Sequence, residues 1–446
     1  MVLHLLTTYF SLALIFFGKL TIQLLTIFGI GAGGTWPGEI ALRGNPHILS
    51  FFLRRVRSGI VLVAGTNGKT TTSKLIQRIV AESNRGNTDR MTIVHNETGA
   101  NLMNGLISAF IREWRIQKPY DFAVLEVDEA SLPHVVAEMQ AYKGKVVLVL
   151  LNLFRDQLDR YGEVRMIARI WKESIKKLPS QTVFVVNADD PELVDVTHGK
   201  KNKYFGIKDP SSYLKKGEHA TDSTYCPFCG QKLTYEGIYS SHLGIWRCQK
   251  CGNTRPKLTL SAYPSVLPGL YNRYNTLAAV LTAQILGINK NQIKNALENF
   301  SPAFGRGEGL IVEGKRVKIF LAKNPAGFNA TVRTVLELGA KNIVFLLNDR
   351  VPDGRDVSWI WDVDFEMIPD AVMCIASGDR AYDLGLRIKY THKSRSGISN
   401  LKIFETTKEA IVFGLKQMKQ HETLYIVPTY SAMLEARKIL TGQAIL

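Results

Sequence analysis

The sequence predicts an α/β protein in which a P-loop ATPase domain, interrupted by a four-cysteine zinc ribbon, is followed by a smaller α/β domain. Short apolar runs rich in β-branched residues alternate with amphipathic stretches, which is typical of a mainly parallel sheet with helices on both faces. A glycine-rich turn follows the first such run, and two C-x-x-C pairs break the pattern near mid-chain. A chain of 446 residues is also too long for one ordinary core, so more than one domain is expected.

The N-terminal segment, residues 1–55, is predicted to be an apolar helical segment and a lead-in. It is nearly uninterrupted apolar sequence as far as Ile30, apart from Lys19 and Gln23. That length would suffice for a membrane span, although a lysine near the middle disfavours a simple one. The segment has no basic start and no small-residue cleavage site, so a signal peptide is not expected. We expect membrane contact, spanning or interfacial; the alternative is a buried helix that packs on the first domain.

The first α/β pattern occupies residues 56–300. It begins with the buried run IVLVAG (60–65), and the stretch after it predicts a helix from about Thr70 to Glu82. Further strands are predicted at 92–95, 121–127, 145–151 and 182–186, and further helices at 102–115 and 271–288. Between about 215 and 260 the sequence becomes rich in Cys, Tyr, Gly and Ser, which indicates an inserted module.

A second α/β pattern occupies residues 301–446. It opens with SPAFGRGEG (301–309), which is predicted to be a linker. Strands are predicted at 317–322, 342–347, 371–376, 401–404 and 423–427, and helices at 406–420 and 430–441. The pattern again predicts alternating strands and helices in one compact unit.

The composition narrows the possible partners. A net charge of +17 predicts attraction to polyanions: a phosphate-rich substrate, nucleic acid or an anionic membrane face. The basic residues are scattered, with no arginine-rich tail or aromatic RNA-binding signature, so no nucleic-acid partner is expected. Five cysteines, four of them in two pairs, indicate a reducing compartment and a metal rather than disulfides.

The segment AGTNGKTTT (64–72) lies at the predicted turn from strand to helix. Backbone N–H groups of such a turn wrap a phosphate, and the helix N-terminus adds a favourable field. Lys69 would reach the β- and γ-phosphates, while Thr70 or Thr71 would meet Mg²⁺. Val63 stands where the strict P-loop pattern has glycine, and the alternative is a simple tight turn. The residues of this loop predicted to bind ATP are Gly65, Thr66, Asn67, Gly68, Lys69, Thr70 and Thr71.

The cysteine pairs CPFCG (226–230) and CQKCG (248–252) are separated by 18 residues, within the spacing of a four-thiolate zinc site. Four thiolates leave no open coordination position, so a structural Zn²⁺ is predicted rather than a catalytic one. The predicted ligands are Cys226, Cys229, Cys248 and Cys251. A zinc ribbon that binds nucleic acid is the alternative.

The glycine-rich loop resembles the ATP loop of the Mur ligase family, whose members join an amine to a carboxylate through an acyl phosphate. Glu126, at the end of a predicted strand, matches the family's Mg²⁺-binding glutamate, and Asn275 matches the asparagine that approaches the adenine. Arg306 lies in GRGE (305–308), which marks the passage to the last domain. Matching segments occur in the family's order: 64–72, 121–127, 152–162, 187–191, 269–279 and 305–308.

Two departures from the family pattern bear on whether the chain binds a second metal ion. Gln157 stands where most Mur ligases have a metal-binding histidine. There is also no obvious counterpart of their carbamylated lysine, although Glu163 is a possible substitute anion.

The last domain and the cysteine insertion point to one branch of the family. LAKNPAGFNA (321–330) and LNDRVPDGRDVSWIWD (347–362) are similar to segments of the ligases that amidate the α-carboxylate of D-glutamate in the lipid II stem peptide. The resemblance implies ammonia from a GatD-type glutaminase subunit, and cytoplasmic work at the inner membrane face. It also implies that Asp356 completes the partner's glutaminase triad by orienting its histidine. The alternative is that Asp353 and Asp356 cap a helix that begins near Val357.

Four further residues are predicted to lie on the substrate side. His95 and Asn96 follow the second predicted strand, while Asn324 and Asn329 lie in the NPAGFN segment. A satisfied histidine at a strand end is the alternative for His95. For the whole chain, the alternatives are an amino-acid ligase of the Mur or folylpolyglutamate type, or a zinc-ribbon ATPase that acts on nucleic acid.

Overall fold

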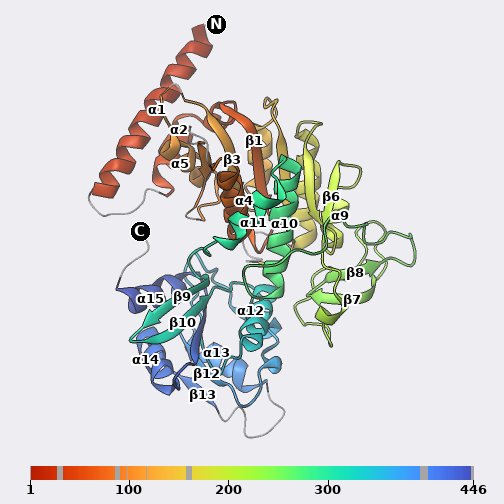
Figure 1. Ribbon diagram of the computed structural model, residues 1–446, viewed down its shortest axis with the longest axis vertical. Helices are drawn as coiled ribbons and strands as arrows, with labels where there is room; N and C mark the ends of the chain where they lie inside the picture. Colours follow the sequence, from red (N-terminus) through yellow and green to blue (C-terminus); the bar gives the residue numbers. More distant parts are fainter. Residues whose placement is uncertain are drawn as a thin grey trace.

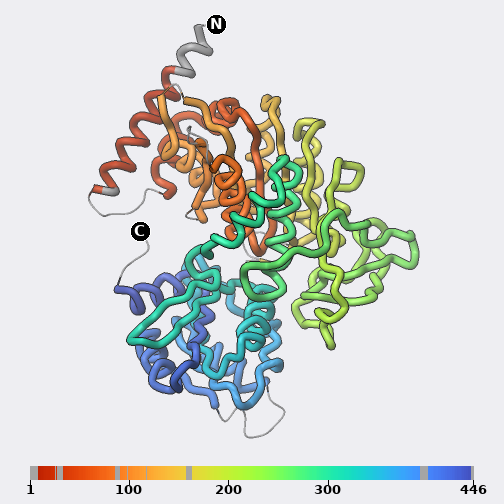
Figure 2. Tube along the Cα trace, in the orientation of Figure 1, coloured from red at the N-terminus to blue at the C-terminus, as the bar shows by residue number. Residues whose placement is uncertain are grey.

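The computed structural model describes residues 2–27, 34–85, 91–97, 99–116, 118–156, 163–391 and 400–442. Two units, each built on a six-stranded sheet, lie one above the other in Figure 1, and a two-stranded hairpin lies beside them. The tube in Figure 2 shows the chain leaving the upper unit for the hairpin and returning before it enters the lower unit.

The upper sheet has the strand order β2-β3-β1-β4-β5-β6, and every neighbouring pair is parallel. Alternate residues of its central strand β1 enter two different cores: Ile60 and Leu62 face one, Val61 and Val63 the other. This explains the continuous apolar runs, because both faces of the sheet are covered. The strands are β1 (Val56–Ala64), β2 (Ile93–His95), β3 (Tyr120–Glu126), β4 (Val146–Leu150), β5 (Val183–Asn187) and β6 (Asn202–Phe205).

Helices cover both faces of this sheet, as predicted. Helices α4 (Lys69–Ser83), α10 (Leu270–Leu286) and α11 (Lys290–Glu298) pack on the face that contains Val61. The opposite core is formed with α2 (Trp36–Gly44), α3 (Ile48–Leu53), α5 (Met103–Glu113), α6 (Leu132–Glu138), α8 (Val164–Ser174) and α9 (Pro191–Val196). A 3₁₀ turn, η1 (Ile175–Lys177), follows α8.

The N-terminal helix α1 (Val2–Ile27) lies along α2 and α5 at the outer edge of the molecule (Figure 1). Ile15 is buried against the first core, and a side chain at Gly18 would meet Ile111 at 3.1 Å. Among the residues that the structure describes, no helix combines the length and the apolar character needed to cross a membrane.

The lower sheet has the order β13-β12-β11-β14-β10-β9, and only β9 runs antiparallel to its neighbour. Helices α12 and α13 pack on one face with η3 and η4, and α14 and α15 pack on the other. The strands are β9 (Arg306–Val312), β10 (Lys315–Phe320), β11 (Asn342–Leu346), β12 (Met373–Ser377), β13 (Leu401–Ile403) and β14 (Thr423–Pro428). The helices are α12 (Pro325–Glu337), η3 (Ser358–Asp362), η4 (Phe365–Met367), α13 (Ala381–Lys389), α14 (Thr407–Gln417) and α15 (Tyr430–Thr441).

The prediction of a linker at 301–309 is wrong for its last residues. From Arg306 onward the segment is strand β9, whose backbone pairs with β10, for example Glu308 with Ile319. No residue of this edge strand is fully buried, so its sequence shows little alternation of apolar and polar residues. Its two glycines, Gly307 and Gly309, therefore made the segment resemble a linker.

The cysteine-rich insertion lies between β6 and α10. After the short turn η2 (Pro210–Ser212), strands β7 (Thr234–Ser240) and β8 (Leu243–Arg247) form an antiparallel hairpin. The hairpin is joined to the upper sheet by two hydrogen bonds: Gly244 N donates to Asp189 O at 3.1 Å, and Trp246 Nε1 donates to Ala188 O at 2.9 Å. The insertion is therefore packed against the upper unit and is not a free appendage.

Candidate active site and cysteine cluster

The loop between β1 and α4 has the backbone that a phosphate-binding turn requires. Gly68 has a φ of +89°, and a Cβ there would lie 2.1 Å from Oδ1 of Asn275 on α10. Only glycine allows this close approach, which brings the loop against the helix that carries Asn275. Asn67 N also donates to Asn152 Oδ1 at 2.8 Å, and Thr66 Oγ1 donates to Phe154 O at 3.2 Å.

A cavity of about 460 Å³ opens beside this loop. Such a volume is usual for small-molecule and cofactor sites. The two sheet units and the cysteine-rich insertion all contribute to its walls, the insertion through Tyr213 and Tyr239. The predicted ATP-binding residues that line it are Asn67, Gly68, Thr71, Asn275 and Arg306.

Lys69 is buried at the start of α4, and in this structure its ammonium group donates hydrogen bonds to oxygens of the loop and to a carboxylate. Its Nζ donates to Gly65 O at 2.6 Å and to Glu129 Oε2 at 2.9 Å. Burial alone would raise the pKa of the Glu129 carboxyl, but Lys69 and Lys323 outweigh it and hold that pKa below its usual value. Glu129 is therefore a buried carboxylate that holds the loop lysine. The sequence pattern did not point to it, although it lies only three residues beyond Glu126.

A second lysine, half-buried, reaches the same place from the lower unit. Lys323, between β10 and α12, forms an ion pair with Asp156, which follows β4. Burial raises the pKa of the Asp156 carboxyl, and Lys323 only partly offsets this. Burial would lower the pKa of Lys323, but Asp156 and Glu129 outweigh it and raise that pKa. Lys323 immediately precedes Asn324, so the sequence signal for this contact is a lysine next to the NPAGFN segment.

Glu126 ends β3 and is 3% exposed. Its Oε1 accepts a hydrogen bond from Asn101 Nδ2 at 3.1 Å, whereas its Oε2 is buried and has no hydrogen-bond partner among the described residues. A buried carboxylate oxygen left without a partner is costly unless it binds a cation, and carboxylate oxygens are preferred Mg²⁺ ligands. The Glu126 carboxylate therefore fits the predicted role as a ligand of a magnesium ion. Thr70, the other predicted ligand, is half-buried in the first turn of α4.

The residues predicted on the substrate side are mostly held by backbone contacts. Asn96 is 2% exposed; its Nδ2 donates to Glu126 O and its Oδ1 accepts from Glu126 N, both at 2.9 Å. It therefore fixes the backbone that carries the Glu126 carboxylate. His95 Nδ1 shares a 2.8 Å hydrogen bond with Val124 O, and burial lowers the pKa of its imidazole.

The two asparagines of the NPAGFN segment have different surroundings. Asn324 caps α12 and exchanges two hydrogen bonds with Asn67, of 3.0 and 3.1 Å, so it touches the nucleotide loop. Asn329 is fully buried and exchanges two 2.8 Å hydrogen bonds with Asp364. A contact of either side chain with substrate stays a prediction.

The aspartates of the D-G-R-D segment also differ. Asp353 is buried and accepts from Ser431 N at 2.8 Å, so it ties the loop to α15. Asp356 is exposed and accepts from Ser358 N at 2.8 Å and from Ser358 Oγ at 3.0 Å. The helix expected near Val357 is η3, whose N-cap is Val357 without a side-chain cap, so neither aspartate is its N-cap residue. Asp356 instead bonds the first residue of η3 from one position further upstream, and its exposed carboxylate is open to a partner protein.

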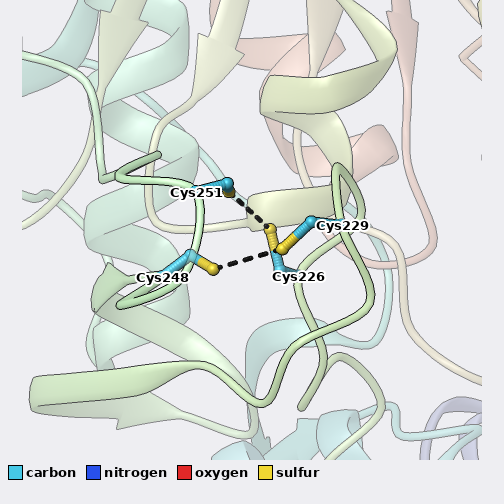
Figure 3. A group of neighbouring side chains, drawn as sticks. All are labelled: Cys226, Cys229, Cys248 and Cys251. Atoms are coloured by element: carbon cyan, nitrogen blue, oxygen red, sulfur yellow. Dashed lines mark hydrogen bonds between the residues drawn. The ribbon is translucent and has the colours of Figure 1, made fainter.

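The four cysteines of the insertion come together from two facing loops (Figure 3). Their sulfurs all lie within 4.8 Å of one another, with Cys226 Sγ 3.7 Å from Cys251 Sγ and Cys229 Sγ 3.5 Å from Cys248 Sγ. A tetrahedral zinc ion with Zn–S bonds of about 2.3 Å would set its sulfurs about 3.8 Å apart. The donor set therefore fits a four-thiolate zinc ion.

Two residues were considered for a second metal site. Gln157 lies outside the described residues, and Glu163 is exposed immediately before α8.

Two family models match the chain: the Mur ligase middle domain over residues 63–283 and the MurT ligase C-terminal domain over residues 321–433. A Streptococcus pneumoniae protein is 32% identical over 438 residues, covering 93% of this chain and 94% of its own length. A Staphylococcus aureus protein is 35% identical over 406 residues, covering 86% and 89%. Both are named lipid II isoglutaminyl synthase (glutamine-hydrolyzing) subunit MurT.

Solved structures share the fold at lower identity. A pseudomurein peptide ligase type C from Methanothermus fervidus has a TM-score of 0.63 at 23% identity, with 87% of this chain and 79% of that chain covered. MurF ligase from Thermotoga maritima in complex with ADP has a TM-score of 0.55 at 16% identity, with 91% and 85% covered. The relatives and the two family models together identify the chain as a member of the MurT family of Mur ligase-type proteins.

Proposed function

We propose that the chain uses ATP to convert the α-carboxylate of D-glutamate, in the stem peptide of lipid II, to the amide of D-isoglutamine. The observation that carries the proposal is the 32% identity, over 93% of the chain, to a relative named as a subunit of lipid II isoglutaminyl synthase. A buried loop lysine, Lys69, and a buried carboxylate, Glu126, agree with such a reaction.

In this proposal, backbone N–H groups of Gly68–Thr71 hold the ATP phosphates, with Asn275 near the adenine and Arg306 in the same cavity. Lys69 neutralises charge as the γ-phosphoryl group passes to the glutamate carboxylate, which gives an acyl phosphate and ADP. Ammonia attacks the acyl carbon, loses a proton, and phosphate leaves. A magnesium ion bound by Thr70 and Glu126 would supply further charge neutralisation at the phosphates.

The ammonia is proposed to come from a GatD-type glutaminase that pairs with this chain. Asp356 is proposed to orient and stabilise the histidine of that partner's active site. The relatives are named as a subunit of a glutamine-hydrolyzing synthase, which supports a partner in their case. The exposed position of Asp356 agrees with the proposed role.

Three further parts complete the proposal. Cys226, Cys229, Cys248 and Cys251 bind a structural zinc ion in a ribbon at about 215–260. The domains run from 56 to 300 and from 301 to 446, after the N-terminal segment 1–55. The enzyme works in the cytoplasm at the inner face of the membrane, where a lipid-linked precursor is found.

The test is ATP turnover by the purified chain with ammonium and lipid II, followed by mass spectrometry of the stem peptide. We expect ADP release together with conversion of one glutamate carboxyl to an amide. Asp356→Ala should keep the ammonium-driven reaction and lose the glutamine-driven one when the partner is present. Asp353→Asn, three residues earlier and buried, is the control for damage to the loop. If lipid II stays unmodified while ATP binds normally, the proposal is wrong.

A further inference from the structure

The outward side of helix α1 is mainly apolar from Tyr9 to Ile27, with Gln23 as an exposed polar residue. Among its exposed large side chains, Phe16 is 73% exposed, Phe17 60% and Ile27 76%. We call this surface the α1 face; its residues are Tyr9, Phe10, Leu12, Phe16, Phe17, Leu20, Leu24 and Ile27. Several large apolar side chains exposed along one side of a helix mark a binding site, because water is a poor solvent for apolar surface.

The inward side of the same helix is fully used by the protein. Ser11, Ile15 and Gly18 face α2 and α5, and Asn45 Nδ2 donates to Ser11 Oγ at 3.0 Å. The charged residue of the helix, Lys19, turns inward as well, since its Nζ donates to the carbonyl oxygen of Trp114. The helix is thus fixed by one side, and its other side offers mainly apolar groups to an occupant, with Gln23 the exposed amide among them.

Basic groups surround the point where α1 meets Trp114. The Arg55 guanidinium lies 4.5 Å from the centre of the Trp114 ring, and its Nη2 donates to Lys118 O at 3.2 Å. Arg54, Arg115 and Lys118 are exposed at this corner, with Glu113 the nearby acid. Two exposed apolar side chains accompany them: Ile116, 80% exposed, and Trp36, 70% exposed beside Pro37, which contacts Gly18.

We infer that the α1 face is a docking surface for an anionic lipid bilayer, with the helix lying in the plane of the interface. The apolar side chains would enter the acyl boundary, while the arginines and Lys118 would meet lipid phosphates. A bilayer suits this combination better than a second copy of the chain, because the basic corner would then face its own like charge. The inference rests on the proposed function only in assuming that the substrate is embedded in a membrane.

The test is co-sedimentation of the full-length chain with vesicles of phosphatidylglycerol and phosphatidylcholine, and with vesicles of phosphatidylcholine alone. We expect binding to the anionic vesicles that weakens as salt is added. Phe16→Asp should lower that binding by about tenfold or more. Ile311→Asp is the matched control, since Ile311 is 71% exposed on strand β9 of the lower unit, and it should bind as the parent does.

Two further measurements separate the possible failures. Phe16→Asp should amidate a water-soluble stem-peptide precursor as fast as the parent, and should lose turnover only on lipid II in vesicles. If the parent amidates neither substrate, the proposed function fails, whatever the vesicles show. The docking surface is refuted if the parent does not bind anionic vesicles or if Phe16→Asp binds them equally well. A parent dimer that Phe16→Asp converts to monomers would assign the face to a second copy and overturn the inference.

Discussion

Replacing Glu129 with glutamine leaves a buried lysine without its charged partner. Lys69 and Glu129 are 5% and 4% exposed, and their atoms are 2.9 Å apart. Removing one partner of such a pair typically costs about 3–5 kcal/mol of folding free energy. The oxygens of Gly65 and Thr66 still accept from Nζ, and the glutamine carbonyl can do so too, so we expect about 3 kcal/mol, the lower end of that range.

The pH dependence of this loss has a definite sign. The folded pKa of Glu129 is lowered, so its contribution to stability is present above the unfolded pKa of about 4.3 and is lost as pH falls through the folded value. Urea unfolding of parent and Glu129→Gln should therefore differ most near pH 7 and converge in acid. Glu298→Gln, which breaks the exposed pair with Lys294, should change little at either pH.

Two results would refute this reasoning. A loss below about 1 kcal/mol near pH 7 would mean that the pair contributes no more than a surface salt bridge. A loss that stays the same in acid would mean that packing of the side chain, and not its charge, stabilises the loop. Because Lys69 is proposed to meet the ATP phosphates, saturating MgATP should also reduce the difference between the two proteins.

Three other changes follow from contacts in the site. Gly68→Ala should weaken ATP binding by tenfold or more, which is about 1.4 kcal/mol. The reason is that the new Cβ would meet Oδ1 of Asn275 and that alanine is strained in the left-handed backbone conformation of this position. Isothermal titration calorimetry with ATP measures the change. Asn275→Ala in the same chain should relieve the clash but not the strain, and an additive result would contradict the geometry. Cys248→Ser, or a chelator, should release about one zinc ion per chain in a colorimetric assay and lower the thermal midpoint, whereas Cys374→Ser should release none. Asp353→Ala should destabilise the lower unit in urea by roughly 1–3 kcal/mol, because two hydrogen bonds to Ser431 are lost, while Asp356→Ala should leave the urea midpoint nearly unchanged.

Features encoded locally could be predicted from the sequence. Strand β1 and helix α4 were found because a buried apolar run, two glycines and an amphipathic stretch follow one another. The gathering of four cysteine sulfurs was predicted for the same reason, since each C-x-x-C-G turn brings its own two sulfurs together. The strand–loop–helix signal and each of the two cysteine turns lie within short stretches of chain.

Contacts between distant segments left no such signal. Lys323 meets Asp156 across 167 residues, and Asn67 meets Asn324 across 257. A buried lysine reads in sequence as an ordinary surface charge until its carboxylate partner is known. Glu129 was missed because three acids lie close together, Glu126 at the end of β3 and Asp128 and Glu129 just after it, and only the packing decides which one faces Lys69. Strand β9 was missed because its apolar alternation is weak.

The nucleotide loop and the exposed Asp356 belong to different units, yet one chain of polar contacts joins them. Asp356 accepts a hydrogen bond from Ser358, the first residue of η3, and η3 ends at Asp362, whose carboxylate lies 3.2 Å from Nη1 of Arg155. Arg155 precedes Asp156, which holds Lys323 beside Glu129. The pair at Arg155 and the pair at Lys323 therefore both join the lower unit to the upper one. Asp156 is 3% exposed, so separating it from Lys323 would be costly, whereas the pair of Arg155 with Asp362 is 30% and 40% exposed and contributes little. The contact at Lys323 is therefore the stronger of the two between the units.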